Sequence, residues 1–198
     1  MNKILGAAAV LSMSLFACGP MAGTDAGTDA GRTDAGTGAP TCASYCTTVM
    51  ANCVGANAQY ANEASCLGTC SAWMAGASGA TSGNSLACRA YHAGAATADL
   101  ALHCPHAGPA GDGSCGSNCE GFCTVATAKC ATQFATAGDC TTACTGFAMN
   151  TARYNSSTTS GNSYACRMYH LSVAATDATQ AATHCAHTTT ASAPGTCQ

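Results

Sequence analysis

Apolar side chains recur at helical spacing along much of the chain. Cys42, Cys46, Val49 and Cys53 are separated by four, three and four residues, which places them on one face of an α-helix. The same spacing recurs across residues 119–130. The β-branched residues are mostly threonine and do not alternate with apolar positions, so no strand is predicted. The pattern favours an all-α fold.

The chain contains an internal duplication in its cysteines. Sixteen of the 17 cysteines divide into two sets of eight, and corresponding positions are offset by 74 to 82 residues. An offset that varies only between motifs is typical of a repeated unit with loop insertions. The first set is Cys42, Cys46, Cys53, Cys66, Cys70, Cys88, Cys104 and Cys115, and the second is Cys119, Cys123, Cys130, Cys140, Cys144, Cys166, Cys185 and Cys197. We expect residues 42–116 and 117–198 to form two modules (the first and the second module below), each closing four disulfides of its own.

The cysteine spacing also suggests part of the disulfide pairing. Two antiparallel helices that each carry a CxxxC motif can be joined by two disulfides, which for the first module would be Cys42–Cys70 and Cys46–Cys66. Eight cysteines allow 105 pairings, so this is a geometric preference. A third, alanine-rich helix is expected to begin near Ser85 or Ser163 and to run to residue 102 or 183. The predicted fold is all-α, small and disulfide-rich, with two tandem three-helix modules.

Composition limits the hydrophobic core and excludes one class of partner. Past residue 18 the chain has no isoleucine, five leucines and one tryptophan, which is less branched and aromatic mass than an ordinary domain buries. Disulfides are therefore expected to replace part of the core. Charged residues make up 8% of the chain and the net charge is −3, which excludes a basic nucleic-acid-binding protein.

The N-terminus has the pattern of a secretory signal. Lys3 supplies the positive charge, and the apolar run that follows has 14 residues, whereas a membrane-spanning helix needs about 20. The sequence Leu15-Phe16-Ala17-Cys18 resembles the lipobox of bacterial lipoproteins. The resemblance implies that residues 1–17 are removed and that Cys18 becomes the lipidated N-terminus. Gly19 in place of an aspartate implies an outer-membrane destination.

A low-complexity segment follows the proposed lipidation site. Residues 18–41 consist mainly of glycine, alanine, threonine and aspartate, and they are expected to form a flexible, disordered tether. The expected location is the cell envelope, with the membrane contacted through the lipid anchor. The sixteen remaining cysteines would then be oxidised. This build favours a binding or interaction module with an envelope or extracellular protein as partner.

The third helix of each module contains the one candidate site. All six histidines fall in three matched pairs, His92/His170, His103/His184 and His106/His187, and the segment also repeats Arg89/Arg167 and Asp99/Asp177. On one continuous helix, His92, Asp99 and His103 share a face. Imidazole and carboxylate groups converging on a stripe suit Zn²⁺ or Cu²⁺. The candidate metal ligands are His92, Asp99, His103 and His106 in the first module and His170, Asp177, His184 and His187 in the second.

Several alternatives to a metal site stay open. In the structural interpretation, His92 bonds Asp99 and Arg89 caps carbonyls or pairs with an acid, and the residues recur for folding alone. Covalent haem is disfavoured because no CxxCH motif occurs, and non-covalent haem lacks large apolar pocket residues. A thiol store for Cu⁺ conflicts with an oxidising compartment. The chain has no nucleophile motif or paired acids, so no enzymatic activity is predicted.

Overall fold

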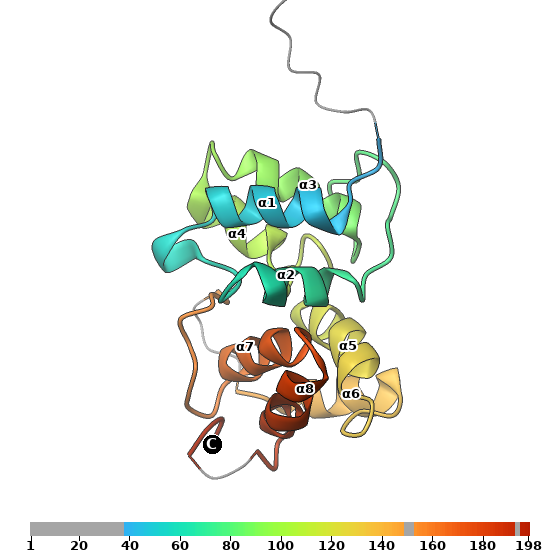
Figure 1. The fold of residues 1–198 in the computed structure, drawn as a ribbon, viewed down its shortest axis with the longest axis vertical. Helices are drawn as coiled ribbons and strands as arrows, with labels where there is room; N and C mark the ends of the chain where they lie inside the picture. Colours follow the sequence, from blue (N-terminus) through green and yellow to red (C-terminus); the bar gives the residue numbers. More distant parts are fainter. Residues whose placement is uncertain (1–37, 149–152, 193–194) are drawn as a thin grey trace, which may run out of the picture. The chain divides into compact units, whose positions relative to one another are not determined.

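The structure is a computed structural model that describes residues 38–148, 153–192 and 195–198, all of which belong to one compact unit. The predicted signal segment, the predicted lipidation site at Cys18 and the predicted tether as far as residue 37 lie outside the described residues. The described residues contain α-helices and short 3₁₀ helices and no strand (Figure 1). The fold is therefore the small, disulfide-rich, all-α fold that the sequence predicts.

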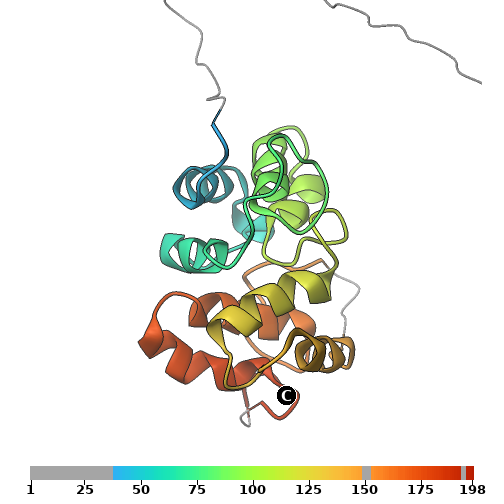
Figure 2. The same cartoon turned by 90° about the vertical axis from the view of Figure 1, so that its right-hand side faces the viewer.

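The described residues of each module form four α-helices in the same order. In the first module these are α1 (Cys42–Asn52), α2 (Glu63–Cys70), α3 (Leu86–Ala95) and α4 (Leu100–Ala107), with a 3₁₀ turn, η1 (Gly55–Asn57), after α1. In the second they are α5 (Asn118–Lys129), α6 (Ala137–Thr145), α7 (Tyr164–Ala174) and α8 (Ala178–His184), followed by the 3₁₀ turn η2 (Cys185–Thr188). Helix α1, in blue, is therefore the first helix of the first module, and α5, in yellow, is the first helix of the second (Figure 2).

The prediction of three helices per module is wrong, because the third predicted helix is broken in two. Asp99 leaves the helical backbone (φ −151°, ψ 98°), and its carboxylate accepts a hydrogen bond from the Leu102 N–H at 3.0 Å. Asp177 starts α8 in the same way, accepting from the Gln180 N–H at 2.9 Å. An aspartate at an N-cap satisfies one of the unpaired N–H groups of the new helix. The chain therefore turns back at each aspartate, and α4 packs on α3 as α8 packs on α7.

Eight disulfides cross-link the described residues. The pairs predicted for α1 and α2, Cys42–Cys70 and Cys46–Cys66, are confirmed. The other pairs are Cys53–Cys104, Cys88–Cys115, Cys119–Cys144, Cys123–Cys140, Cys130–Cys185 and Cys166–Cys197. Every pair lies within one module, and corresponding cysteines pair alike. The disulfides therefore fix the helix pairs α1/α2 and α5/α6 and attach the last helix of each module to its first.

Arg89 and Arg167 are buried, and neither has a carboxylate partner among the described residues. The Arg89 guanidinium donates to the carbonyls of Gly108 (3.2 Å), Ser85 (3.3 Å) and Pro109 (3.4 Å). It also lies 4.0 Å from the centre of the Trp73 ring. Arg167 repeats this arrangement with three backbone carbonyls and the ring of Phe147. Of the two roles considered for Arg89, the structure shows carbonyl capping.

The two modules pack against each other mainly through α2 and the helices α5 and α7. Gly68 of α2 lies against the Ala175 carbonyl so closely that a Cβ atom there would overlap it. The Asn84 amide donates to Thr124 Oγ1 at 2.8 Å, and Lys129 Nζ donates to Ser71 Oγ at 2.8 Å. Among the described residues, no helix has the length and apolarity that a membrane span requires.

Candidate metal centres

The break at Asp99 brings the three histidines of the first module together. In one continuous helix, His92 and His103 would stand about 16 Å apart along the axis. Because α4 folds back on α3, their ring centres are 5.1 Å apart, and the rings of His92 and His106 are 4.8 Å apart. One ring nitrogen from each of the three histidines lies within 4.8 Å of the others. We call this group the first cluster.

The second module repeats this geometry with different spacing in the sequence. His184 Nδ1 lies 2.7 Å from His170 Nδ1, and His187 Nδ1 lies 3.3 Å from the same atom. The corresponding distance between His92 and His103 in the first cluster is 2.9 Å. His170, His184 and His187 form the second cluster, again with their ligand nitrogens within 4.8 Å of one another. The δ-nitrogens of His184 and His187 thus both face that of His170.

A backbone carbonyl fixes the tautomer of the innermost histidine in each cluster. His92 Nε2 lies 3.1 Å from the carbonyl oxygen of Thr81, and His170 Nε2 lies 3.1 Å from that of Thr159. A carbonyl oxygen only accepts, so Nε2 carries the hydrogen and donates it. The Nδ1 atom then presents its lone pair to the centre of the cluster. This is the outer-shell hydrogen bond that orients a metal-binding histidine.

The third histidine of the first cluster has one nitrogen without a partner. His106 Nδ1 is buried and makes no hydrogen bond within the described residues. On its other side, His106 Nε2 lies 3.8 Å from a carboxylate oxygen of Asp112, which also pairs with Arg153 Nε at 3.0 Å. The Nδ1 atom of His106 is therefore left available to a ligand.

Burial keeps several of these imidazoles neutral. Loss of solvent lowers the pKa of His92 and His106 below its usual value of 6.5. In the second cluster, burial lowers the pKa of His184 and takes that of His170 to about 4. Only a neutral imidazole offers a lone pair to a metal ion. At neutral pH these rings are already in the form that ligates.

The two aspartates predicted as ligands are not in the clusters. The side chains of Asp99 and Asp177 are engaged as N-caps of α4 and α8, where each carboxylate accepts a backbone N–H. The hydrogen bond considered between His92 and Asp99 is replaced by the contacts of His92 with Thr81 and His103. An aspartate ahead of an alanine-rich segment is a helix-start signal, and that signal was available in the sequence.

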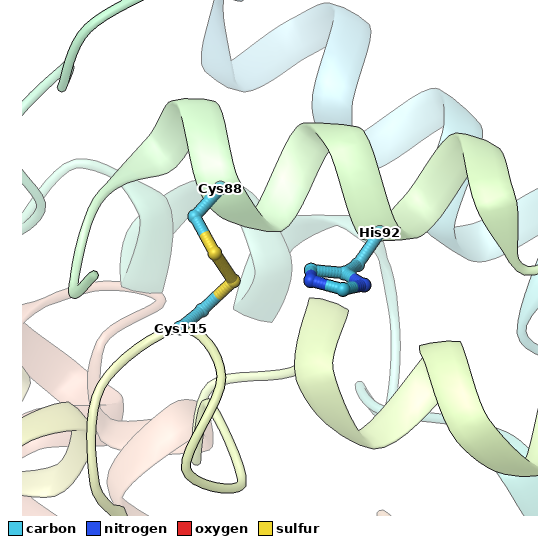
Figure 3. Close-up of side chains that lie close together, drawn as sticks. All are labelled: Cys88, His92 and Cys115. Carbon is cyan, nitrogen blue, oxygen red and sulfur yellow. A yellow bond between two sulfur atoms is a disulfide. The ribbon is translucent and has the colours of Figure 1, made fainter. Parts of the chain in front are cut away.

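A disulfide stands beside the innermost histidine of each cluster. Cys88 and His92 are one helical turn apart on the same side of α3, and Cys115 reaches the same side from the loop after α4 (Figure 3). Cys166, His170 and Cys197 repeat this arrangement. The sulfur atoms are bonded to each other, so they are not thiolate ligands. The Cys88–Cys115 disulfide instead holds Ser114, whose Oγ lies 3.1 Å from His92 Nε2.

Four contacts of the clusters were missed in the sequence. These come from Thr81, Thr159, Ser114 and Asp112. Thr81 and Thr159 each lie seven residues before a matched cysteine, so the repeat itself marked them. They act through backbone oxygens, however, which any residue type supplies. Asp112 has no counterpart in the second module, where Pro194 occupies the corresponding position in the sequence, and comparison of the modules could not identify it.

Comparison with known proteins identifies a family and two partial relatives. Two proteins described as "Aurasperone B biosynthesis cluster protein A", from two strains of Aspergillus niger, are 42% and 41% identical to this chain over 71 residues. These residues are 35% of this chain and 23% of each relative, so the chain spans about a quarter of the relatives' length. No solved structure matches. The BfoA family C-terminal domain matches residues 19–119, just over half of the chain, including the whole first cluster. The chain belongs to the BfoA family.

Proposed function

We propose that the chain binds two first-row transition-metal ions, one in each histidine cluster. The ligands are His92, His103 and His106 in the first cluster, and His170, His184 and His187 in the second. The observation that supports this most strongly is the convergence of three ring nitrogens on one point, in two modules that differ at most other positions.

A hydrogen bond between two histidines is enough to explain why two of the three ring nitrogens in each cluster lie close together. An imidazole nitrogen has a single in-plane lone pair, so His170 Nδ1 accepts one N–H, from His184 at 2.7 Å. His187 Nδ1 still lies 3.3 Å from the same atom, and His106 Nδ1 in the first cluster is buried without a partner among the described residues. A structural histidine pair would not require this third ring. A metal ion uses all three.

The spacing and the donor set both suit Zn²⁺ or Cu²⁺. Two nitrogens bound to one tetrahedral zinc ion are about 3.3 Å apart, since each bond is about 2.0 Å long. The closest cluster distances, 2.7, 2.9 and 3.3 Å, need only small ring movements to reach this value. Neutral imidazoles suit these ions, whereas the thiolates that favour Cu⁺ are locked in disulfides.

Metal binding is compatible with the lipid anchor inferred from the sequence. We propose that Cys18 is lipidated and that this anchor holds the two modules at the cell envelope, where they bind a protein partner. All large apolar side chains with high exposure among the described residues belong to the first module, for example Met74 at 79%. Export of the chain with a Cys18→Ser variant tests the anchor. The acyl mass should be present on the unaltered chain alone, and its absence there would refute lipidation.

Metal content after equilibrium dialysis tests the proposed function. The oxidised full chain should retain two zinc ions, because each cluster supplies three neutral nitrogens. His92→Gln and His170→Gln should each retain one, and the double variant none, while a denatured mass shows that all disulfides still form.

The aspartates provide the matched control. Asp99→Asn and Asp177→Asn keep good N-cap residues and should leave both zinc ions bound. If these variants lose zinc, the aspartates are ligands and the all-histidine ligand set is wrong. If neither the unaltered chain nor any variant retains zinc, copper or cobalt, the clusters are structural.

A further inference from the structure

Within the described residues, each cluster offers three candidate metal ligands and no fourth. In the part of the chain that the structure describes, the only other ligand-type side chains grouped with these histidines are Cys88 and Cys115 in one module and Cys166 and Cys197 in the other. Those four cysteines form disulfides. Asp99 and Asp177 are engaged at helix starts. The described residues therefore do not complete a four-coordinate shell.

The outer side of each cluster reaches the solvent. His92 and His170 are the inner members, with 6% and 7% of their surface exposed. The other four histidines are half-buried. Next to them on the first module, Tyr91 and Leu102 are 48% and 41% exposed. A metal held between the three rings would thus lie nearest to solvent on the side of the half-buried rings.

The charge of the site favours an anion at that position. Three neutral imidazoles leave the full charge of a divalent ion uncompensated. In the first cluster the nearest acid is Asp112, beside His106 Nε2, and Arg153 already pairs with it. Asp177, the acid nearest in sequence to the second cluster, caps α8. An anion bound at the fourth coordination position of the metal (the open position below) would neutralise part of the positive charge that the protein leaves uncompensated.

We propose, on the basis of the proposed function, that each bound metal takes a small anion as its fourth ligand. The step is a ligand exchange in which a metal–water bond breaks, a metal–anion bond forms, and one water molecule is released. No electron is transferred. Three protein ligands with one exchangeable position is also the arrangement found in catalytic rather than structural zinc sites.

Cobalt substitution tests the open position through its visible spectrum. The full oxidised chain is loaded with two Co²⁺ ions, freed of excess metal, and titrated with acetate and separately with azide. The visible absorption bands of the bound Co²⁺ should shift with both anions, and the shift should saturate as the anion concentration rises. In His170→Gln, which keeps only the first cluster, the amplitude should fall to half. His184→Gln replaces it if the first variant does not form its disulfides.

The outcomes separate the two proposals. If Co²⁺ binds but its spectrum is unchanged by both anions, the position is closed or blocked and the anion proposal is overturned, while metal binding stands. If Co²⁺ does not bind at all, the proposed function fails, and the anion proposal fails with it.

Discussion

At the scale of single residues, the buried guanidinium groups show how this chain orders its loops with little apolar mass. Arg89 donates to Gly108 and Pro109, which follow α4, and to Ser85, which precedes α3. A planar guanidinium satisfies three carbonyls at once and can stack on Trp73. Arg89 therefore joins the two ends of the helix pair that holds the first cluster.

Replacing Arg89 with lysine should destabilise the first module strongly. Lysine keeps the charge but lacks the planar fork, so buried carbonyls lose donors and an ammonium group is left partly unpaired. We expect the free energy of unfolding in urea to fall by about 3 kcal/mol. Arg153→Lys, at a half-exposed side chain, is the matched control and should cost less than about 1 kcal/mol. Equal losses in both variants would contradict this role of Arg89.

The histidines should make the stability of the metal-free chain depend on pH. Burial lowers the pKa of His170 to about 4, whereas the same group in the unfolded chain titrates near 6.5. Between these values the unfolded chain binds more protons, so the free energy of unfolding should decrease as the pH falls from about 6.5 to about 4. Urea unfolding at several pH values measures this. His170→Gln should flatten the curve, and an unchanged slope in that variant would refute the assignment.

At the scale of elements, the helix break at Asp99 and its repeat at Asp177 determine whether a site exists. The break allows α4 to return along α3, and it converts three histidines spread along the sequence into one cluster. The N-cap hydrogen bond to Leu102 N–H is the local cause of the break. The start of α4 at Asp99 therefore determines where two of the three histidines of the first cluster lie.

Asp99→Ala should weaken the first metal site without touching a ligand. Loss of the cap costs about 1 kcal/mol and loosens the start of α4, which positions His103 and His106. We expect zinc affinity at the first cluster to fall while the second cluster is unchanged, measured by calorimetric titration. Asp99→Asn retains the cap and should restore normal affinity. Weakening by the asparagine variant as well would indicate direct ligation.

At the scale of the whole molecule, disulfides supply the stability that the core does not. In each module three disulfides connect the first helix to the second and the last, a fourth ties α3 or α7 to the segment after the last helix, and large apolar side chains are few. Each disulfide contributes about 2–4 kcal/mol. Full reduction should therefore abolish the helical circular dichroism and the thermal transition. A reduced chain that keeps both would show that packing alone is sufficient.

The sequence predicts the all-α class and the two disulfides that join α1 to α2, because both follow from local spacing. Cys42, Cys46 and their partners lie on two adjacent short helices, where periodicity fixes the facing positions. The sequence also identified the six histidines. It misplaced Asp99 and Asp177, because their carboxylates fit a helical stripe as well as a helix cap. The carbonyl of Thr81 and the carboxylate of Asp112 come from loops, whose paths periodicity does not determine.

The most direct test of the account is a native mass spectrum of the zinc-equilibrated full chain beside its denatured spectrum. The account predicts two zinc ions in the native state, and a denatured mass sixteen hydrogens below that of the reduced chain, two for each of the eight disulfides. A fully oxidised chain without any bound metal would contradict the central claim that the histidine clusters are metal centres.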